Sequence, residues 1–136
     1  EALGVYRAQF QPSKQLARAY AMVGINVVCA ETDEEARRLF TTVQQSFANL
    51  VRGRGGQIQP PIDDIEKYWS PAEKHQASRM LAHSGVGSPT TVRKGLEDFV
   101  AATKADELMI VTSIYDPAAR IRSYELVAET WGAAAA

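Results

Sequence analysis

Polar side chains follow the two most apolar runs of the sequence. Glu31 comes directly after the first run, and Thr112, Ser113 and Asp116 come at the end of the second. Carboxyl and hydroxyl groups in such places can bind a small molecule when the carboxyl ends of two parallel strands meet at one edge of a sheet. Helix capping explains the same residue types at the same positions, so both interpretations stay open.

The glycine-rich segment "GVGSP" suggests a different chemistry. Gly85 and Gly87 precede Ser88, a natural N-cap, and Pro89, a natural first helical residue. Free amides at a helix N-terminus carry partial positive charge, so the segment could hold a phosphate or another anion. There is neither a GxGxxG pattern nor a Walker lysine here, and ordinary turn formation accounts for the same glycines.

Few residues point to metal or nucleophilic chemistry. The single cysteine, Cys29, lies within an apolar run, so it is expected to be a small buried hydrophobe and a thiolate zinc site would lack its other ligands. His75 and His83 have no carboxylate pair to complete a metal site, and we expect both on the surface. No metal is predicted.

The first apolar run predicts a buried strand that leads directly into a helix. Residues Met22 to Ala30 are rich in β-branched side chains, as in a strand covered on both faces. Asn26 alternates with the valines and isoleucine around it, so it points into the interior of a barrel or is a satisfied buried amide. Thr32 and Glu35 can then bond each other's free backbone N–H groups. The apolar face of the helix comprises Ala36, Leu39, Phe40, Val43, Phe47 and Leu50.

A long irregular connection and a second helix come next. Residues 51–69 contain three glycines and a proline pair, which predicts either a binding loop or a solvated excursion with its arginines on the surface. Ser70, Pro71 and Glu73 then predict a helix N-terminus. This helix is expected to run to about Ala82.

A third helix and a second strand complete the pattern. Gly95 lies inside the third helix and costs about 1 kcal/mol relative to alanine, which close packing would explain. The strand begins at Leu108, and Asp116 with Pro117 begins a last helix. The expected apolar face of the third helix is Val92, Leu96, Phe99 and Val100. The expected face of the last helix is Ile121, Tyr124 and Ala128.

Composition excludes several classes of protein. The 136 residues are 46% hydrophobic and 23% charged, which is ordinary for one globular unit spanning residues 1–136. The formal charge of -1 and the lack of a basic stripe argue against nucleic-acid and anionic-membrane partners. No apolar run approaches the roughly 20 residues that span a bilayer, and the first ten residues show neither a signal-peptide core nor a cleavage pattern, so we expect a cytoplasmic protein. The start at Glu1 and the closing "WGAAAA" lead us to expect a fragment.

Several segments carry a family resemblance across nearly the whole chain. They are "YRAQFQPS", "MVGINVVCAETDEEARRLFTTVQQSF", "WSPAEK", "GVGSPTTVRKGLEDFV", "ADELMIVTSIYD" and "ARIRSYELVAE". The most specific are the strand followed by "ETDEEARRL" and the later pair "GSPTTVRKGL" and "ADELM". Together they resemble the C-terminal part of the bacterial luciferase-like flavin monooxygenases.

The resemblance implies a fold class, a cofactor and partners. Members of this family are α/β proteins that form an eight-stranded β/α barrel, bind reduced FMN supplied by a flavin reductase, and use O2 to oxidise a small organic substrate. The present chain would supply the last two βα units, with residues 22–29 as strand seven and 108–114 as strand eight, together with extra helices. The catalytic residues would lie upstream of Glu1, so none is assigned here.

The candidate site residues come from their positions in the predicted strands and helices, because the family's flavin contacts and proton-transfer residues are expected on the missing strands and cannot be carried over. Ser88 and Asn26 are the candidates for contact with FMN. We assign no general base, because capping explains the acidic candidates without function. The candidates for the substrate pocket are Glu31, Thr112, Ser113 and Asp116.

Three positions depart from the family pattern. Thr90 replaces a usual Glu, which removes a favourable acid from the first turn of a helix. Lys104 replaces a Gly that ends this helix, so a left-handed C-cap is less favourable and the boundary is expected to shift. Pro117 stands where many relatives have His.

Two strands cannot close a barrel, because their edges leave backbone groups unpaired and their inward faces expose apolar side chains. We therefore expect the remainder of the same barrel or a second copy of the chain to cover them.

Three functions stay open. The first is a flavin-dependent monooxygenase whose pocket wall this chain supplies, the chain alone being inactive. The others are a non-catalytic flavin-binding or structural derivative of the fold and an unrelated α/β interaction module.

Overall fold

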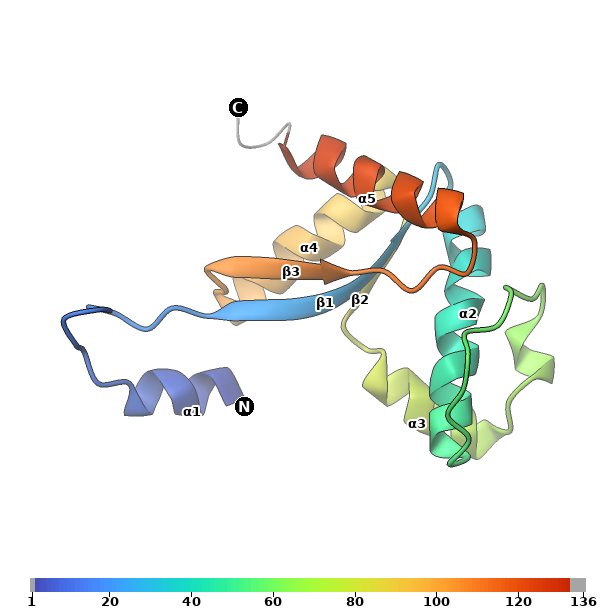
Figure 1. Cartoon of the computed structure of the whole chain (residues 1–136), viewed down its shortest axis with the longest axis horizontal. Coiled ribbons are helices and arrows are strands. Elements are labelled where there is room, and N and C mark those ends of the chain that lie inside the picture. The colour runs from blue at the N-terminus through green and yellow to red at the C-terminus, as the bar shows by residue number, and fades with distance from the viewer. Residues whose placement is uncertain (1, 133–136) are drawn as a thin grey trace.

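The computed structural model describes residues 2–132 as a three-stranded parallel sheet flanked by helices (Figure 1). The strand order is β2-β1-β3, so β1 is central and the chain crosses it between β2 and β3. The elements in chain order are α1 (Ala2–Gln9), β1 (Met22–Cys29), α2 (Asp33–Val51), the 3₁₀ turn η1 (Ile65–Lys67), α3 (Pro71–Met80), β2 (Ser84–Gly87), α4 (Pro89–Thr103), β3 (Glu107–Val111) and α5 (Pro117–Gly132).

The predicted adjacency of the two apolar strands is confirmed. Residues Met22 to Asn26 of β1 pair in parallel with Glu107 to Val111 of β3. Beyond the ladder, the Thr112 hydroxyl donates to the Val27 carbonyl. The strand ends three residues before the predicted Ile114, although Ile114 is fully buried. The carboxyl ends of β1 and β3 therefore point the same way.

β2 is a strand that the sequence did not predict. We expected a glycine-rich loop and two strands, but residues Ser84 to Gly87 pair in parallel with the second half of β1. The segment "SGVG" has one large apolar side chain and no readable period, so its partner strand decides its conformation. An added Cβ at Gly85 would lie 3.4 Å from Val27 Cγ2, which shows how closely the two strands approach. The expectation of two βα units is therefore wrong: the described chain has three strands.

Helices cover the faces of β1 unequally. Odd-numbered residues of β1 face α4 and α5, and even-numbered residues at its carboxyl end face α2. The predicted apolar faces of α2 and α4 are largely confirmed, with Leu50 the exposed exception. The first cluster contains Ile25, Val27, Cys29, Val92, Leu96, Leu126 and Val127. The second contains Val28, Ala30, Ala36, Leu39, Val43, Leu81 and Ile114.

The amino-terminal half of the α2-facing side of the sheet is open. Met22, Met109 and Val111 are 50%, 53% and 43% exposed, although they lie on strands. Gly24 pairs with Met109, and Asn26 with Val111, so these side chains are neighbours across β1 and β3. We call this surface the open face. Exposed apolar side chains on a sheet of this kind indicate a surface that another element covers.

α5 turns a different side to the core from the one predicted. Ser123, Leu126 and Val127 are buried. Ile121 and Tyr124, expected on the buried face together with Ala128, are 60% and 43% exposed, and Ala128 is also exposed. Apolar spacing predicts the helix, but the position of the sheet decides which stripe becomes buried.

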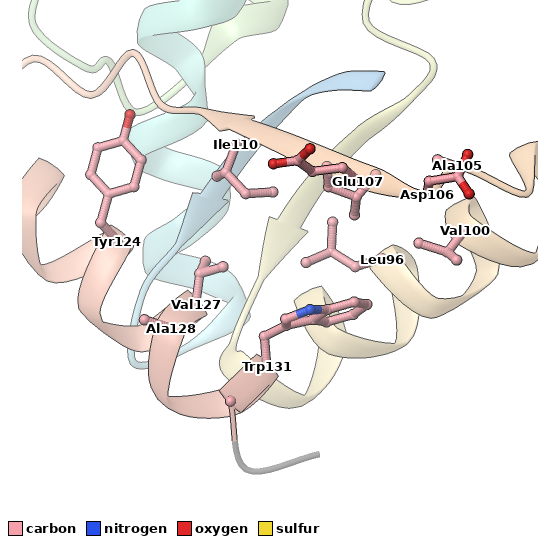
Figure 2. A pocket seen from close by; sticks show the side chains of 12 residues that line it. Leu96, Val100, Ala105, Asp106, Glu107, Ile110, Tyr124, Val127, Ala128 and Trp131 are labelled. Atoms are coloured by element: carbon pink, nitrogen blue, oxygen red, sulfur yellow. The ribbon is translucent and has the colours of Figure 1, made fainter. Parts of the chain in front are cut away.

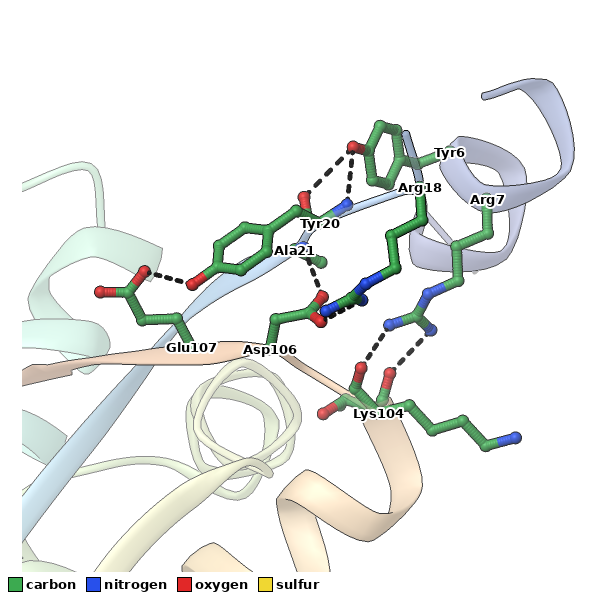
Figure 3. A network of polar contacts seen from close by, with 9 residues as sticks. Tyr6, Arg7, Arg18, Tyr20, Ala21, Lys104, Asp106 and Glu107 are labelled. Atoms are coloured by element: carbon green, nitrogen blue, oxygen red, sulfur yellow. Dashed lines mark hydrogen bonds and ion pairs between the residues drawn. The ribbon is translucent and has the colours of Figure 1, made fainter. Parts of the chain in front are cut away.

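α4 ends where the family pattern would end it, contrary to the expected shift. Lys104 adopts the left-handed conformation, with φ 51° and ψ 38°, in which a non-glycine residue is unfavourable. Arg7 of α1 donates to the carbonyls of Thr103 and Lys104 at 2.8 and 2.7 Å (Figure 3). A cationic donor thus satisfies free carbonyls at this helix C-terminus.

Asp106 anchors the chain that leads into β1 (Figure 3). Its carboxylate accepts from the Ala21 N–H at 2.9 Å and pairs with Arg18 at 2.7 Å. These contacts, with the Ala21 N–H first, lower the pKa of Asp106. Next to it, the Tyr20 hydroxyl donates to Glu107 at 3.1 Å. Polar contacts therefore hold the N-terminal segment, since α1 contributes no buried residue.

The long connection is irregular as predicted, but Arg52 does not lie free on its surface. The side chain is about one quarter exposed and forms a two-point ion pair with Glu73, with Nε–Oε1 2.7 Å and Nη2–Oε2 3.0 Å. It also donates to the Tyr68 carbonyl at 2.7 Å and stacks on the Tyr68 ring. Glu73 completes a capping box with Ser70, so α3 begins as predicted, and it ends at Met80, near the expected Ala82.

The Arg52–Glu73 pair predicts a specific acid sensitivity. Arg52 above all, and then the Ser70 N–H, lower the pKa of Glu73 from 4.5 to about 2. Because the folded-state pKa is depressed, this contribution to stability is complete above pH 4.5 and is lost as pH falls toward 2. We expect Glu73→Gln to reduce the slope of the unfolding free energy against pH in this window. The reduction corresponds to at most about one proton fewer bound on unfolding. Urea titrations across the window measure this slope.

The control for this experiment is Glu34→Gln. Glu34 is an exposed carboxylate in the first turn of α2, and it forms no ion pair with any residue of the described chain. Equal slopes for the two variants would contradict the assignment to Glu73.

Candidate functional site

The carboxyl ends of the three strands lead into three helices at one edge of the sheet. β1 runs into α2, β2 into α4, and β3 into α5, and the strands are all parallel. Ligands of open α/β sheets bind at this edge. The candidates for FMN and substrate, Asn26 apart, lie in these connections.

The N-terminus of α4 already holds a carboxylate from the chain itself. The Ser88 N–H donates to Asp33 Oδ1 at 2.6 Å, while the Ser88 hydroxyl donates to Thr91 Oγ1 and caps no backbone group. The Ser88 N–H first, and then the Thr91 hydroxyl, lower the pKa of Asp33. Asp33 thus takes the position in which we expected a phosphate, and no local pattern indicates a contact across 55 residues.

Gly87 is required for this contact. Its φ is 153°, a value that side-chain-bearing residues rarely adopt. A Cβ there would lie 2.6 Å from Thr91 Cγ2 and 2.7 Å from Asp33 Oδ1. The glycine therefore makes room for Asp33, which explains it without a ligand.

Glu31 lies at the carboxyl edge as predicted, but in an ion pair. Arg122 of α5 donates to it at 3.0 Å and also contacts Glu125 and Glu129 at 3.3 and 3.2 Å. These carboxylates, Glu31 first, raise the pKa of Arg122. Arg122 was not among the predicted site residues. Its acids three and seven positions later, Glu125 and Glu129, were a usable signal for ion pairs along this helix.

The other substrate-pocket candidates differ in availability. Thr112 is buried, its hydroxyl bonded to the Val27 carbonyl and its N–H to the Tyr124 hydroxyl at 3.2 Å. Asp116 caps α5 by accepting from the Ala119 N–H at 2.7 Å. Ser113 is half-buried and forms no side-chain hydrogen bond within residues 2–132. Of these three, Ser113 alone keeps its polar side chain unpaired.

Asn26 lies beside a residue that sequence analysis missed. Its register partner is Ser84 of β2, so the two side chains lie together on the face that carries Val28. Ser84 Oγ is buried and has no hydrogen-bond partner among the described residues. The pair borders the open face at Val111, which is the register partner of Asn26 on β3. This is the place in the described chain where unpaired polar groups meet exposed apolar surface.

The prominent surface cavities lie elsewhere. Five cavities among residues 2–132 have none of the six candidate residues in their lining. The largest of the five, about 730 Å³, lies between α4, α5 and β3. The candidates therefore line none of these five cavities.

Cys29 and the histidines behave as predicted. Burial raises the pKa of the Cys29 thiol to about 11, and its N–H donates to the buried Ser123 hydroxyl at 2.9 Å. His75 and His83 are exposed. Across residues 2–132, no group of three or more His, Cys, Asp or Glu side chains is placed to hold a metal ion. No helix of that span is both long and apolar enough to cross a bilayer.

Comparison with known proteins relates the chain to longer ones. No family model matches it. It is 43% identical over 126 residues to a luciferase-like monooxygenase of Escherichia coli (strain K12), covering 93% of this chain and 38% of that protein. It is also 43% identical over 130 residues to the uncharacterized protein YvbT of Bacillus subtilis (strain 168), covering 96% of this chain and 39% of YvbT.

A solved structure agrees with these relatives. The crystal structure of apo-MsnO8 superposes with a TM-score of 0.72 and 29% identity, over 96% of this chain and 40% of that one. The chain therefore spans less than half the length of the proteins it matches, and the similarity covers nearly all of the chain.

Proposed function

We propose that this chain is the C-terminal part of a flavin-dependent monooxygenase of the luciferase type, which oxidises a small organic substrate with reduced FMN and O2. The observation that carries the proposal is the 43% identity, over 93% of the chain, to a protein named luciferase-like monooxygenase. The parallel β/α arrangement and the similarity to apo-MsnO8 support the same assignment. An eight-stranded barrel in the parent and a flavin reductase as partner belong to the proposal.

The open face of this chain fits a contact with FMN, whereas the N-terminus of α4 does not. The α4 N-terminus does not fit the phosphate, because Asp33 already accepts from the Ser88 N–H. The open face fits a wall of the pocket, because the unpaired Ser84 hydroxyl and the half-buried Asn26 lie beside apolar side chains. When bound, reduced FMN would supply the electrons that activate O2. Asn26 and Ser84 would orient a polar edge of the ligand, and Met109 would exclude water.

A non-catalytic derivative of the same fold is the second candidate. Glu31, Thr112 and Asp116 each already bond another group of the chain. This agrees with a pocket wall in an active parent, and equally with a flavin-binding protein without turnover. An unrelated interaction module loses support, since the similarity to the named relative extends along nearly the whole chain.

Flavin binding and oxygen uptake by the full-length parent distinguish these functions. We expect the parent to bind reduced FMN and to consume O2 in a substrate-dependent way when a flavin reductase is supplied, and the 136-residue chain alone to do neither. Binding without substrate-dependent uptake would select the non-catalytic derivative. A parent that does not bind FMN would refute both.

Two variants of the parent test the assigned contacts. Asn26→Leu should weaken FMN binding about tenfold, the loss expected for one hydrogen bond in a partly closed pocket. Ser88→Ala should change the affinity by less than about twofold, because Asp33 holds the Ser88 backbone N–H in both proteins. The reverse order would place the phosphate at α4.

A further inference from the structure

The sulfur-containing side chains of this chain, one cysteine and three methionines, differ in their access to an oxidant. Cys29 is buried with a pKa of about 11, so its thiol stays protonated and reacts slowly with peroxides. The methionines are all about half exposed: Met22 50%, Met80 49% and Met109 53%. A thioether needs no deprotonation to react, so exposure and position decide which methionine is oxidised.

Met109 lies on the open face beside a notch. Leu108 and Ile110, its neighbours in β3, line the groove between α4 and α5, so Met109 lies on the opposite side of the strand (Figure 2). Its register partner on β1 is Gly24, which has no side chain, and nothing lies within 4 Å of a Cβ added there. The surface next to Met109 is therefore left unfilled by the described chain.

The register sets how far each methionine of the open face lies from the proposed FMN contact. Asn26 pairs with Val111, so Met109 is two residues from that partner and roughly 8 Å from Asn26 between Cα atoms. Met22 is four residues from Asn26 along β1, or roughly 13 Å. Met109 is therefore the thioether nearer to the place that we assign to the ligand.

Met80 has the same exposure in a different place. It is the last residue of α3, beside His75 and Arg79 on the surface. α3 packs against α2 and is not part of the sheet that carries the open face. Oxidation of Met80 therefore measures peroxide in the solvent, whereas oxidation of Met109 measures peroxide at the open face.

We propose that Met109 is an oxidation site of the parent protein, converted to methionine sulfoxide by hydrogen peroxide released at the open face, with Met22 reacting more slowly. This inference rests on the proposed function, which supplies the peroxide. When O2 takes two electrons and two protons from reduced FMN and no substrate accepts an oxygen atom, it leaves as H2O2. The peroxide then gives one oxygen to the thioether: an S–O bond forms, the O–O bond breaks, sulfur loses two electrons, and the other oxygen leaves as water.

This oxidation would change the ligand site itself. A thioether is flexible and apolar, whereas a sulfoxide is polar and chiral. At Met109 the new polar group would stand in the pocket wall to which we assign the exclusion of water. We therefore expect substrate-free turnover to weaken FMN binding by the parent at least about fivefold.

Peptide mass spectrometry of the full-length parent measures the sulfoxide at each methionine. In a first incubation, the FMN-free parent receives hydrogen peroxide in solution. In a second, the parent with FMN receives NADH and a flavin reductase in air, without substrate, and catalase destroys peroxide that reaches the solvent. We expect the ratio of the Met109 to the Met80 oxidation rate to be at least about tenfold higher in the second incubation, with a smaller rise for Met22.

Three results in a parent that binds FMN would overturn this inference alone. The first is an equal ratio in the two incubations. The second is faster sulfoxide formation at Met22 than at Met109. The third is the loss of all oxidation in the presence of catalase, because peroxide would then act only from the solvent. A parent that does not bind FMN would refute the proposed function and this inference together.

Met109→Leu and Met80→Leu are matched variants for the effect on FMN binding. Leucine keeps an apolar side chain of similar size but has no sulfur to oxidise. After substrate-free turnover, the wild type and Met80→Leu should both lose affinity for FMN, whereas Met109→Leu should retain the affinity that it had before turnover. Equal losses in the two variants would contradict the assignment to Met109. The sulfoxide measurement uses the wild type, so it decides the matter even if Met109→Leu does not fold.

Discussion

Replacing Gly87 with alanine should destabilise the fold by about 3 kcal/mol or more. The backbone strain of an alanine at φ 153° accounts for roughly 1–3 kcal/mol. The new Cβ would also lie within 2.7 Å of Asp33 Oδ1 and would drive this carboxylate from the Ser88 N–H. Loss of a hydrogen bond to a charged group adds about 1.5–3 kcal/mol. Since β2, α4 and the start of α2 meet here, the loss would affect the whole sheet.

Gly95→Ala is the matched control, with an effect of opposite sign. Gly95 lies inside α4, and nothing lies within 4 Å of an added Cβ, so the close packing that we expected does not occur within this chain. The alanine should stabilise the fold by about 0.5–1 kcal/mol through helix propensity. Urea unfolding followed by circular dichroism measures both variants. A Gly87→Ala protein as stable as the wild type would refute the role given to this glycine.

Leu96→Ala should cost about 2–5 kcal/mol. Leu96 is 1% exposed and lies at the centre of the cluster that joins α4 and α5 to β1. Truncation removes buried apolar surface and enlarges the neighbouring groove, which the rest of the cluster can refill only in part. The free energy of unfolding in urea gives the size of this loss.

Cys29 supplies a second measurement for this variant. The thiol belongs to the same cluster, and burial raises its pKa to about 11, so it reacts only when the cluster opens. We expect the rate of its reaction with a disulfide reagent to rise at least tenfold in Leu96→Ala. Leu50→Ala is the control, because Leu50 is 57% exposed and its truncation should cost less than about 0.5 kcal/mol. Similar losses for both leucines would contradict the assigned core.

Local signals in the sequence determined most of the elements. The change of period around residues 30–33 predicted a strand followed by a helix, and β1 and α2 follow that prediction. Ser70 with Glu73 predicted the start of α3, and they form its capping box. Such signals succeed because the atoms involved are a few residues apart, so the contacts that they make are already implied by their spacing.

The tertiary structure decided the contacts that join distant parts of the chain. β2 is a strand because β1 lies beside it, and Arg52 is partly buried because Glu73 lies beside it. For the candidate site, the residue types and their position at the carboxyl edge were predictable. Their availability was not, since Asp33 reaches Ser88 and Arg122 reaches Glu31 only in the folded chain.

The sequence by itself thus determined the residue types, the starts of α2, α3, α4 and α5, and the parallel adjacency of the two apolar strands. Only the tertiary structure decided which polar groups are already paired, which stripe of α5 is buried, and that β3 is left uncovered. The physical reason is that periodicity reports that a face is apolar, whereas burial depends on a partner that is distant in sequence. Ile121 and Tyr124 lie on an apolar face of α5, but no element of the described chain packs against that face. The local pattern therefore predicted the apolar face correctly and its burial wrongly.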